Sequence, residues 1–435
     1  MKTLISATGL AIVASAWLSP LARAQSDYIV HEWGTFTSVQ GGDGELLPWR
    51  PLQTSELPGF VYNWNRPGLN RMHAGSVPGF KNALVTLQRM ETPVIYFYSS
   101  RDMNADVSVA FPQGVITEWY PQATQIGPSE PLDTNLPCNS TLMESRAVWK
   151  NLRLVAPKMD YAVDAVRLPQ DKFGSHYFAA RETGSDIVQM DFVGPTNQVS
   201  ETDKFIFYRG AGSFKTPLHV SVDATDAVVA ANTGTEGLAH LFLVSVRDNG
   251  HGKTAAFATL KPVAAGASSP CPRLQPADFV PLEKFQSAIS AQMQAALAEA
   301  GLFKAEAAAM VNTWKDSWFA EEGDRVLYIL PRAWTDATLP MTLNPTPLKL
   351  VRVMVGRAEI ITPQTALELS GNLTRAAAGD AGGRAVAKQE IKGLGRFAEP
   401  ALRLAYGQNQ STNAFELGYQ LLYKGAQEAA QLKSE

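Results

Sequence analysis

The chain has 435 residues, of which 45% are hydrophobic and 18% charged, and its formal net charge at pH 7 is −3. These proportions are typical of a folded protein with a sizeable core, and the length predicts two or three domains. A slightly acidic chain has no bulk attraction for nucleic acid or anionic lipid, which argues against both as general partners.

The first 24 residues have the pattern of an export signal. Lys2 gives a positive start, residues 4–18 form an apolar run that is too short for a membrane span, and Ala22-Arg23-Ala24 supplies a cleavage site. We expect cleavage after Ala24 and a mature protein that is periplasmic or secreted; an uncleaved anchor is the alternative. No later apolar run reaches the roughly 18 residues of a spanning helix, so we expect no transmembrane segment after cleavage.

Residues 25–275 are predicted to form a β-rich, sandwich-like domain. Runs of β-branched and aromatic residues at 92–99, 106–112, 204–210 and 218–224 are bounded by Gly, Pro, Asn and Asp, which is typical of strands. Their irregular spacing, without repeats, favours a sandwich or two packed sheets. The intervening residues 45–82 are rich in Pro, Gly, Trp and Tyr and are predicted to be a long ordered loop.

The two cysteines of the chain, Cys138 and Cys271, both lie next to proline in this β-rich region. An even pair of cysteines in an exported chain predicts a disulfide. Two separate buried thiols are the alternative. Neither cysteine belongs to a CxxC or CxxCH motif, so the sequence indicates neither redox catalysis nor covalent haem.

Residues 276–435 are predicted to be mainly helical, which makes the whole chain an α+β protein. An apolar residue recurs every fourth position from Phe285 to Leu297, as in an amphipathic helix, and Gly301 ends the pattern. A second helix is predicted at 304–319. Strand patterns at 325–331 and 348–361 interrupt the helices, and further helices are expected at 364–373, 396–404 and 414–432, with a flexible joint at 376–384.

The first strand pattern contains His31-Glu32-Trp33. A zinc-protease motif needs a second histidine three residues after the glutamate on a helix, and Thr35 occupies that position in a predicted strand. In a strand, His31 and Trp33 share one face while Glu32 lies on the other. The main expectation is a structural strand in which Glu32 pairs with an arginine, and a functional role for His31 and Glu32 is the alternative.

Charged residues also occur inside other apolar strand patterns, where burial costs several kcal/mol unless they are paired. One interpretation is a set of structural ion pairs. The other is a cleft in which Glu91 and Glu118 act as general acid and base, with arginines that orient them or hold an anionic group. The arginines are Arg181 and Arg209, Glu32 and His31 would lie nearby, and Trp49 and Trp119 would bind sugar rings.

Three functions are therefore considered. The first is an exported hydrolase or lyase that acts on an extracellular polymer or glycoside, so that a polysaccharide is the expected partner. The second is a non-catalytic envelope or ligand-binding protein. The third is a metalloenzyme whose ligands come from the histidines His31, His219, His240 and His251. No two histidines have a close ligand spacing, and no motif indicates a cofactor or metal.

Several stretches together resemble an uncharacterised family of exported bacterial proteins with an N-terminal HEWGTFT motif. They are HEWGTFTSV, METPVIYFY, ITEWYP, HYFAARET, KFIFYRG, SWFAEEGDRVLYILPR, VRVMVGRAE and LGRFAEP. The resemblance spans most of the chain, roughly His31 to Pro400. It implies no activity, cofactor or catalytic residue, but it implies that the β-rich and helical regions form one unit.

Overall fold

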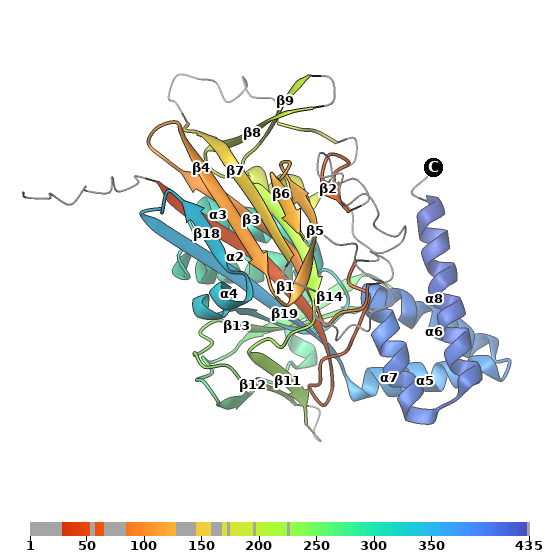
Figure 1. The fold of residues 1–435 in the computed structure, drawn as a ribbon. Coiled ribbons are helices and arrows are strands. Elements are labelled where there is room, and N and C mark those ends of the chain that lie inside the picture. Colours follow the sequence, from red (N-terminus) through yellow and green to blue (C-terminus); the bar gives the residue numbers. More distant parts are fainter. Residues whose placement is uncertain are drawn as a thin grey trace, which may run out of the picture.

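A computed structural model describes residues 28–52, 57–64, 84–127, 145–157, 168–171, 175–194, 197–223 and 227–432. Sheets come first along the chain and helices later, so the predicted α+β class is confirmed (Figure 1). The predicted export signal, residues 1–24, lies outside the described residues, as does most of the predicted loop after residue 64.

The largest element is a ten-stranded sheet with strands from both regions of the chain. Its order is β16 (Val280–Pro281), β14 (Lys253–Thr259), β13 (Leu241–Asp248), β17 (Gly323–Ile329), β19 (Lys349–Ile361), β1 (Ile29–Gly41), β3 (Gln88–Tyr98), β10 (Ile206–Gly212), β5 (Gly114–Tyr120) and β2 (Tyr62–Asn63). The strands predicted at 325–331 and 348–361 correspond to β17 and β19. The predicted boundary at residues 275/276 therefore falls within one continuous sheet.

Strand β1 lies in the middle of this sheet. It pairs in parallel with β19 and antiparallel with β3, and it is buried on both faces over almost its whole length. Because a parallel pair cannot be joined by a short hairpin, residues more than 300 positions apart must meet to form it. This contact places the HEWGTF stretch at the centre of the molecule.

One face of the ten-stranded sheet, here called the sandwich side, packs against a second sheet. The second sheet has the order β18 (Met341–Asn344), β4 (Met103–Phe111), β7 (Ser145–Val155), β8 (Ile187–Val193) and β9 (Gln198–Asp203), with β6 (Gln125–Gly127) also paired to β7. Their shared core includes Val30, Phe36, Val107, Trp119 and Trp149. A smaller sheet of β11 (Leu218–Val222), β12 (Val228–Asn232) and β15 (Ser268–Pro270) lies below them (Figure 1).

The opposite face, here called the helix side, is covered by α2 (Leu282–Glu299) and α3 (Lys304–Phe319). The predicted apolar row from Phe285 to Leu297 is buried against the sheet, which confirms the amphipathic interpretation of α2. Gly301 ends the helix pattern with a φ of 114°, a left-handed conformation that glycine adopts readily. The 3₁₀ turn η3 (His176–Arg181) packs beside α3.

The C-terminal helices α5 (Pro363–Ala377), α6 (Ala381–Leu394), α7 (Ala398–Asn409) and α8 (Thr412–Leu432) form a separate bundle beside the sheets (Figure 1). The joint predicted at 376–384 is wrong in its second half, because Asp380 caps the N-terminus of α6 and residues 381–384 are helical. A short helix α4 (Arg332–Thr338) was also not predicted. Among the described residues, no helix combines the length and the apolar character needed to cross a membrane.

Candidate functional site

The helix side of the ten-stranded sheet changes from apolar to charged along its central strands. Strand β19 presents Val353 and Val355 to the helices and then Arg357 and Glu359. Strand β3 makes the same change, and β1 passes from Trp33 to Thr37, whose hydroxyl donates to Glu91. Nine charged residues, here called the charged row, follow the strands β17, β19, β3, β10 and β5 and the adjoining ends of α3 and η5 (Gly395–Phe397): Arg89, Glu91, Glu118, Arg209, Glu321, Arg325, Arg357, Glu359 and Arg396.

A bulge in β3 sets which way this strand presents its charges. Thr92 has a φ of 46°, which is strained for a β-branched residue, and the register between β1 and β3 shifts at this point. The extra residue keeps Glu91 and Val94 on the same face. Gly34 accommodates the bulge, because a Cβ there would lie 2.9 Å from the Cα of Pro93. The glycine of the HEWGTF stretch is thus a packing requirement of the site's own strand.

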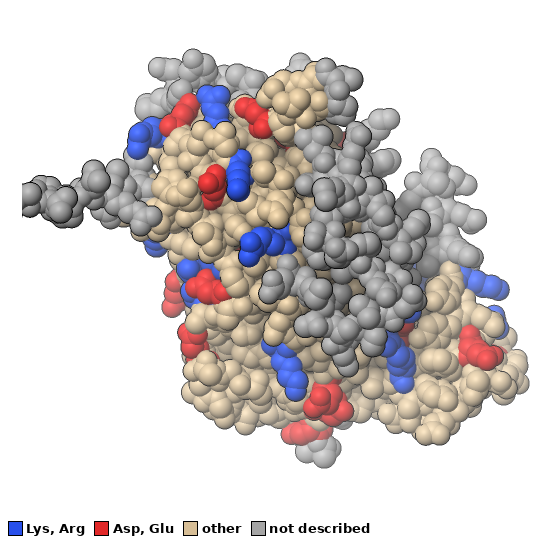
Figure 2. Space-filling view, in the orientation of Figure 1, with Lys and Arg blue, Asp and Glu red and all other residues tan. Residues whose placement is uncertain are grey.

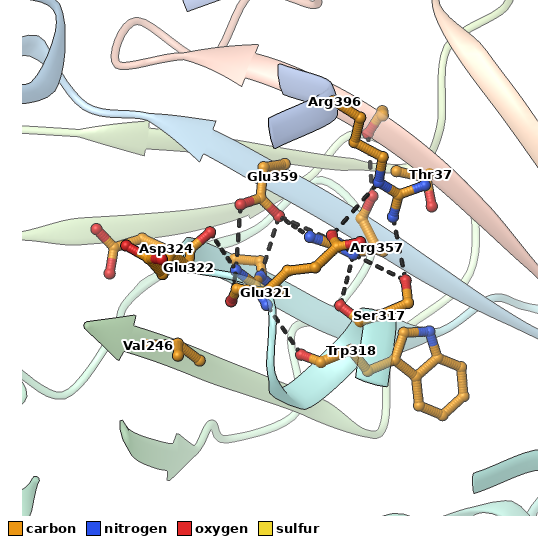
Figure 3. Close-up of polar contacts among 12 residues, drawn as sticks. Thr37, Val246, Ser317, Trp318, Glu321, Glu322, Asp324, Arg357, Glu359 and Arg396 are labelled. Atoms are coloured by element: carbon orange, nitrogen blue, oxygen red, sulfur yellow. Dashed lines mark hydrogen bonds and ion pairs between the residues drawn. The ribbon is translucent and has the colours of Figure 1, made fainter. Parts of the chain in front are cut away.

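At one end of the charged row, two arginines hold the C-terminal end of α3 (Figure 3). Arg357 donates from Nη1 to the backbone oxygen of Ser317 at 2.6 Å, and Arg325 donates to the backbone oxygens of Trp318 and Glu321 at 3.1 and 2.7 Å. Both arginines also contact Glu359. Cations suit helix C-termini, where carbonyl groups lack helical partners, so this end of the row is a structural cap.

In the middle of the row, Arg396 joins the C-terminal bundle to the sheet. Its Nη1 donates to Oε1 of Glu91 at 2.8 Å, and its Nε lies 3.3 Å from Glu321. Burial by itself would raise the pKa of Glu91, but Arg396, Arg89 and the Thr37 hydroxyl overcome it and hold this pKa well below its usual range. Burial likewise opposes the nearby arginines at Glu321, whose pKa is lowered to about 2. Both carboxylates are therefore ionised at neutral pH.

Arg209 and Glu118 face each other on the neighbouring strands β10 and β5. Arg209 donates from Nε and Nη2 to the two carboxylate oxygens of Glu118 at 3.0 and 2.7 Å, and both side chains are buried. A bidentate pair of this kind fixes geometry as well as charge. The predicted proximity of Glu91, Glu118 and Arg209 is thus met on a single face, with Arg89 between them.

Arg89 is the member of the row with the fewest contacts. It is 5% exposed, its Nε lies 3.7 Å from Oε2 of Glu91, and that Nε has no hydrogen-bond partner in the described part of the chain. Burial lowers the pKa of Arg89 to about 10, with Arg209 and Arg396 adding to the effect against Glu91. Glu91 therefore lies at ion-pair distance from Arg89 but beyond hydrogen-bond distance.

His176, on η3, lies over the same part of the row. Burial lowers its pKa to about 4, and the positive charges of Arg209, Arg89 and Arg396 add to this effect. Its ring packs against Trp314 of α3 with 5.2 Å between ring centroids. The indole Nε1 of Trp314 has no hydrogen-bond partner within the described residues. A neutral imidazole and an unused indole N–H therefore lie beside the surplus positive charge.

The charges of the row do not balance. Its five arginines face four glutamates, so with all groups ionised it carries one excess positive charge. On the face shown in Figure 2, the surface charges are scattered and mixed in sign. The imbalance is local to the helix side of the sheet.

Four predicted site residues lie apart from the charged row: Arg181, Glu32, Trp119 and His31. Arg181 makes a bidentate pair with Asp203 at 2.8 Å and packs over the ring of Phe178. Glu32 is on the sandwich side, where it accepts from Tyr208 and from Arg352. The predicted pairing of Glu32 with an arginine is confirmed. Trp119 is also in the sandwich core.

His31 faces the helices but belongs to the apolar end of the sheet. Its Nδ1 lies 2.6 Å from Oε2 of Glu306 on α3, both residues are fully buried, and its ring stacks on Phe303 at 4.4 Å. Trp49 is buried in the core of the C-terminal bundle, where Arg396 lies 5.9 Å from its ring. Of the two predicted ligand-binding residues on this side, only Trp49 borders the charged row.

The predictions on cysteine and metal are not decided by these contacts. Cys271 is buried and burial raises its pKa to about 12, whereas Cys138 lies outside the described residues, so the disulfide stays a prediction. His219 lies on β11 of the small sheet, His240 immediately precedes β13 of the ten-stranded sheet, and His251 occupies the turn between β13 and β14. Among the described residues, no three His, Cys, Asp or Glu side chains converge as a metal site would require.

Sequence reasoning missed most of the charged row, although the sequence contained a signal for it. Arg357 and Glu359 lie in VRVMVGRAE, Glu321 and Arg325 in SWFAEEGDRVLYILPR, and Arg396 in LGRFAEP. These are among the stretches that carry the resemblance to the HEWGTFT family. Their presence in these stretches does not show that the residues meet, because only the tertiary contacts bring them together.

Comparison with known proteins adds no function. No family model matches the chain, and no curated protein matches it. Among solved structures, the yeast delta-COP-I mu-homology domain complexed with a Dsl1 WxWxV peptide aligns over 77% of this chain and 98% of its own, at 7% identity and a TM-score of 0.26. A similarity this low carries no argument about either fold or function, and membership of the HEWGTFT family stays a prediction.

Proposed function

We propose that this chain is an exported ligand-binding protein that holds an anionic group of an extracellular ligand on the charged row. The observation that carries the proposal is Arg89, a buried arginine in a row with one more arginine than glutamate. Its Nε has no hydrogen-bond partner among the described residues and lies 3.7 Å from Glu91. An anion beside the exposed edge of the Arg89 guanidinium would supply the missing negative charge.

The energetics favour a ligand over a purely structural role for Arg89. A structural ion pair is balanced, as Arg209 and Glu118 are, because an uncompensated buried charge is costly. A binding site instead leaves part of its charge unsatisfied until the ligand arrives. Ligand binding then stabilises the folded state by mass action, by about 2.7 kcal/mol at a concentration 100 times Kd.

The test is a thermal-shift titration of the mature protein with anions and with neutral sugars. Phosphate, sulfate, a uronic acid and an acidic polysaccharide represent the anions, and glucose and a neutral polysaccharide serve as controls. We expect a saturable rise in Tm with at least one anion and none with the neutral compounds.

Mass spectrometry of the exported protein tests the export signal separately, since cleavage after Ala24 leaves Gln25 at the N-terminus.

Two variants separate site binding from general electrostatics. Arg89→Gln should abolish the anion-dependent rise in Tm. Arg247→Gln is the matched control, because Arg247 pairs with Asp324 at a half-exposed position and loses the same formal charge. If both variants lose the effect equally, or if no anion raises Tm, the proposed function is wrong.

A hydrolase or lyase that acts on an acidic polymer is the second candidate, and His176 is the observation that favours it. An imidazole that stays neutral at pH 7 beside arginines combines a proton acceptor with groups that hold a carboxylate. Glu91, held ionised, suits an electrostatic role better than that of a proton donor. Incubation with uronate polymers should then release unsaturated or reduced-length products, and His176→Asn should stop the release while anion binding persists.

A further inference from the structure

We propose that the C-terminal bundle has a second binding surface, on which a line of aromatic rings and two arginines hold a chain of acidic sugars. The line consists of Tyr406 of α7 and of Phe415, Tyr419 and Tyr423 of α8, and it is here called the aromatic row. It lies on the bundle and not on the sheet, so the proposal goes beyond the proposed function and does not depend on it.

The rings of the aromatic row follow one another without a gap. Phe415, Tyr419 and Tyr423 are four residues apart, so they share one face of α8. Their successive ring centroids are 4.8 and 6.1 Å apart, and Tyr406 adds a fourth ring 4.8 Å from Phe415. A continuous line of rings fits a linear ligand with repeating units better than a single small molecule.

The aromatic row is more exposed than packing within the bundle requires. A different stripe of α8, with Ala414, Leu417 and Leu421, is buried in the core of the bundle. In contrast, Tyr423 is 50% exposed and Tyr406 is 38% exposed. An exposed apolar patch with a polar rim marks an interaction site, and tyrosine provides a large, rigid contact at a low cost in conformational entropy.

Two arginines beside the aromatic row share a single carboxylate. Arg50 and Arg403 both contact Oε1 of Glu399, Arg403 at 3.3 Å. The hydroxyl of Tyr419 lies 3.5 Å from the same oxygen, which places the three charges next to the row. The side chains of Arg50 and Arg403 are 31% and 36% exposed, whereas that of Glu399 is 9% exposed. The charge that this cluster presents to solvent is therefore positive, which suits an acidic ligand.

A surface pocket at the Tyr406 end of the aromatic row indicates what kind of ligand fits. Its volume is about 180 Å³, counting the space open to solvent, and its lining includes the rings of Tyr406 and Phe415 together with Asn409 and Ser411. Aromatic walls with a few hydrogen-bonding groups suit sugars, whose rings have apolar faces and hydroxyl edges. A chain of acidic sugars thus accounts for the rings, the pocket and the arginines together, whereas a peptide of acidic side chains accounts for the arginines alone.

The experiment measures how tightly the mature protein binds three polymers by isothermal titration calorimetry. We expect saturable binding of polygalacturonate. Neutral dextran, which lacks the charge, and polyglutamate, which lacks the sugar rings, should each bind at least about tenfold more weakly. Polyglutamate binding as tight as polygalacturonate binding would overturn the role of sugars, and dextran binding as tight would overturn the role of the arginines. No binding of polygalacturonate would overturn the whole inference.

Two variants test whether the polymer lies on the aromatic row. Tyr423→Ser and Arg403→Gln should each weaken polygalacturonate binding about tenfold. Val193→Ser is the matched control for the first, because it removes a 73% exposed apolar side chain from β8 in the second sheet. Arg247→Gln, which removes a half-exposed paired arginine, is the matched control for the second. Both controls should bind the polymer as the wild type does.

Arg89→Gln separates the aromatic row from the charged row. This variant should keep polygalacturonate binding while it loses the rise in Tm with small anions such as phosphate, and Tyr423→Ser should do the reverse. Unchanged polymer binding in Tyr423→Ser, or its loss in Arg89→Gln, would overturn this inference and leave the proposed function intact. A wild type whose Tm does not respond to small anions would overturn the proposed function alone.

Discussion

The two faces of the ten-stranded sheet bury carboxylates in different ways. On the sandwich side, Glu32 accepts from Tyr208 and Arg352, and Arg352 also donates to Asp336, so each charge has a partner of opposite sign. On the helix side, the charged row has one arginine in excess, and Nε of Arg89 has no hydrogen-bond partner in the described part of the chain. An ionised residue in an apolar strand can thus belong to a set of partners with balanced charge, as Glu32 does, or to a row with surplus charge, as Arg89 does.

The comparison teaches that burial alone does not distinguish structure from function. What distinguishes the two faces is the balance of charge. Buried guanidinium nitrogens without a hydrogen-bond partner among the described residues occur on both faces, as Nη2 of Arg352 does on one and Nε of Arg89 and of Arg325 do on the other. Glu32 lies in a closed set, and such a set is expected to contribute to stability without binding anything. In the charged row, Arg325 and Arg357 cap the C-terminal end of α3. Arg89, near His176, has no such structural role and carries the surplus charge. The variants below exploit that contrast.

The largest effect is expected from breaking the closed set. Glu32→Gln removes the buried charge opposite Arg352 and leaves that guanidinium with the half-exposed Asp336 as its acidic partner, so we expect a loss of about 3 kcal/mol of unfolding free energy. Urea denaturation followed by circular dichroism measures this loss. Anion binding by the remaining folded protein should be unchanged, because Glu32 lies on the opposite face of the sheet from Arg89.

A loss below about 1 kcal/mol for Glu32→Gln would contradict the contrast between the two faces. The control is Arg247→Gln, which removes one partner of a half-exposed pair and should cost less than about 1 kcal/mol.

A smaller effect is expected from His176 and depends on pH. Burial and the neighbouring arginines lower its pKa to about 4 in the folded protein, against about 6.5 in the unfolded chain. The folded state therefore binds fewer protons, so His176 contributes stability that is present above pH 6.5 and lost as pH falls towards 4. The full shift corresponds to about 3–4 kcal/mol.

The measurement is the free energy of unfolding of wild type and His176→Asn between pH 7.5 and pH 4.5. We expect the wild type to lose more stability than the variant as pH falls over this range. Parallel pH profiles for the two proteins would show that His176 is not held neutral by the row. An anion bound at Arg89 should also raise the pKa of His176, so that binding below pH 6 takes up protons.

Local patterns predicted the elements of the fold better than their assembly. The apolar row of α2 and the alternating residues of β3 and β10 each indicate their structure from a short window. The pairing of β1 with β19 joins residues 320 positions apart and has no local signature, so the sequence did not predict a sheet that spans both regions. The α6 segment was missed because Gly382 and Gly383 lower helix propensity, and tertiary packing of Ala387 and Ile391 overrides it.

The sequence predicted only those residues of the candidate site that stand out within their local pattern. Glu91, Glu118 and Arg209 stand out because each is charged within an apolar strand, and the structure does bring them to one face. Arg396 sits in a helical segment where a charged residue is unremarkable, so only the tertiary contact with Glu91 identifies it. Arg181 and Glu32 were predicted on the same grounds, but they pair with Asp203 and Arg352, respectively, away from the charged row.

Arg89→Met is expected to have the smallest effect on stability. It is also the sharpest test of the contrast between the two faces of the sheet. Replacing a surplus buried cation with an apolar residue of similar length removes an unfavourable desolvation and few contacts, so stability should rise or change by less than about 1 kcal/mol. Glu32→Gln removes one charge of a closed set and is expected to do the opposite. Denaturation of both variants without ligand, followed by anion titration, makes the comparison. A loss of several kcal/mol in Arg89→Met would place Arg89 among the structural ion pairs, because an arginine reserved for a ligand should be dispensable to the unliganded fold.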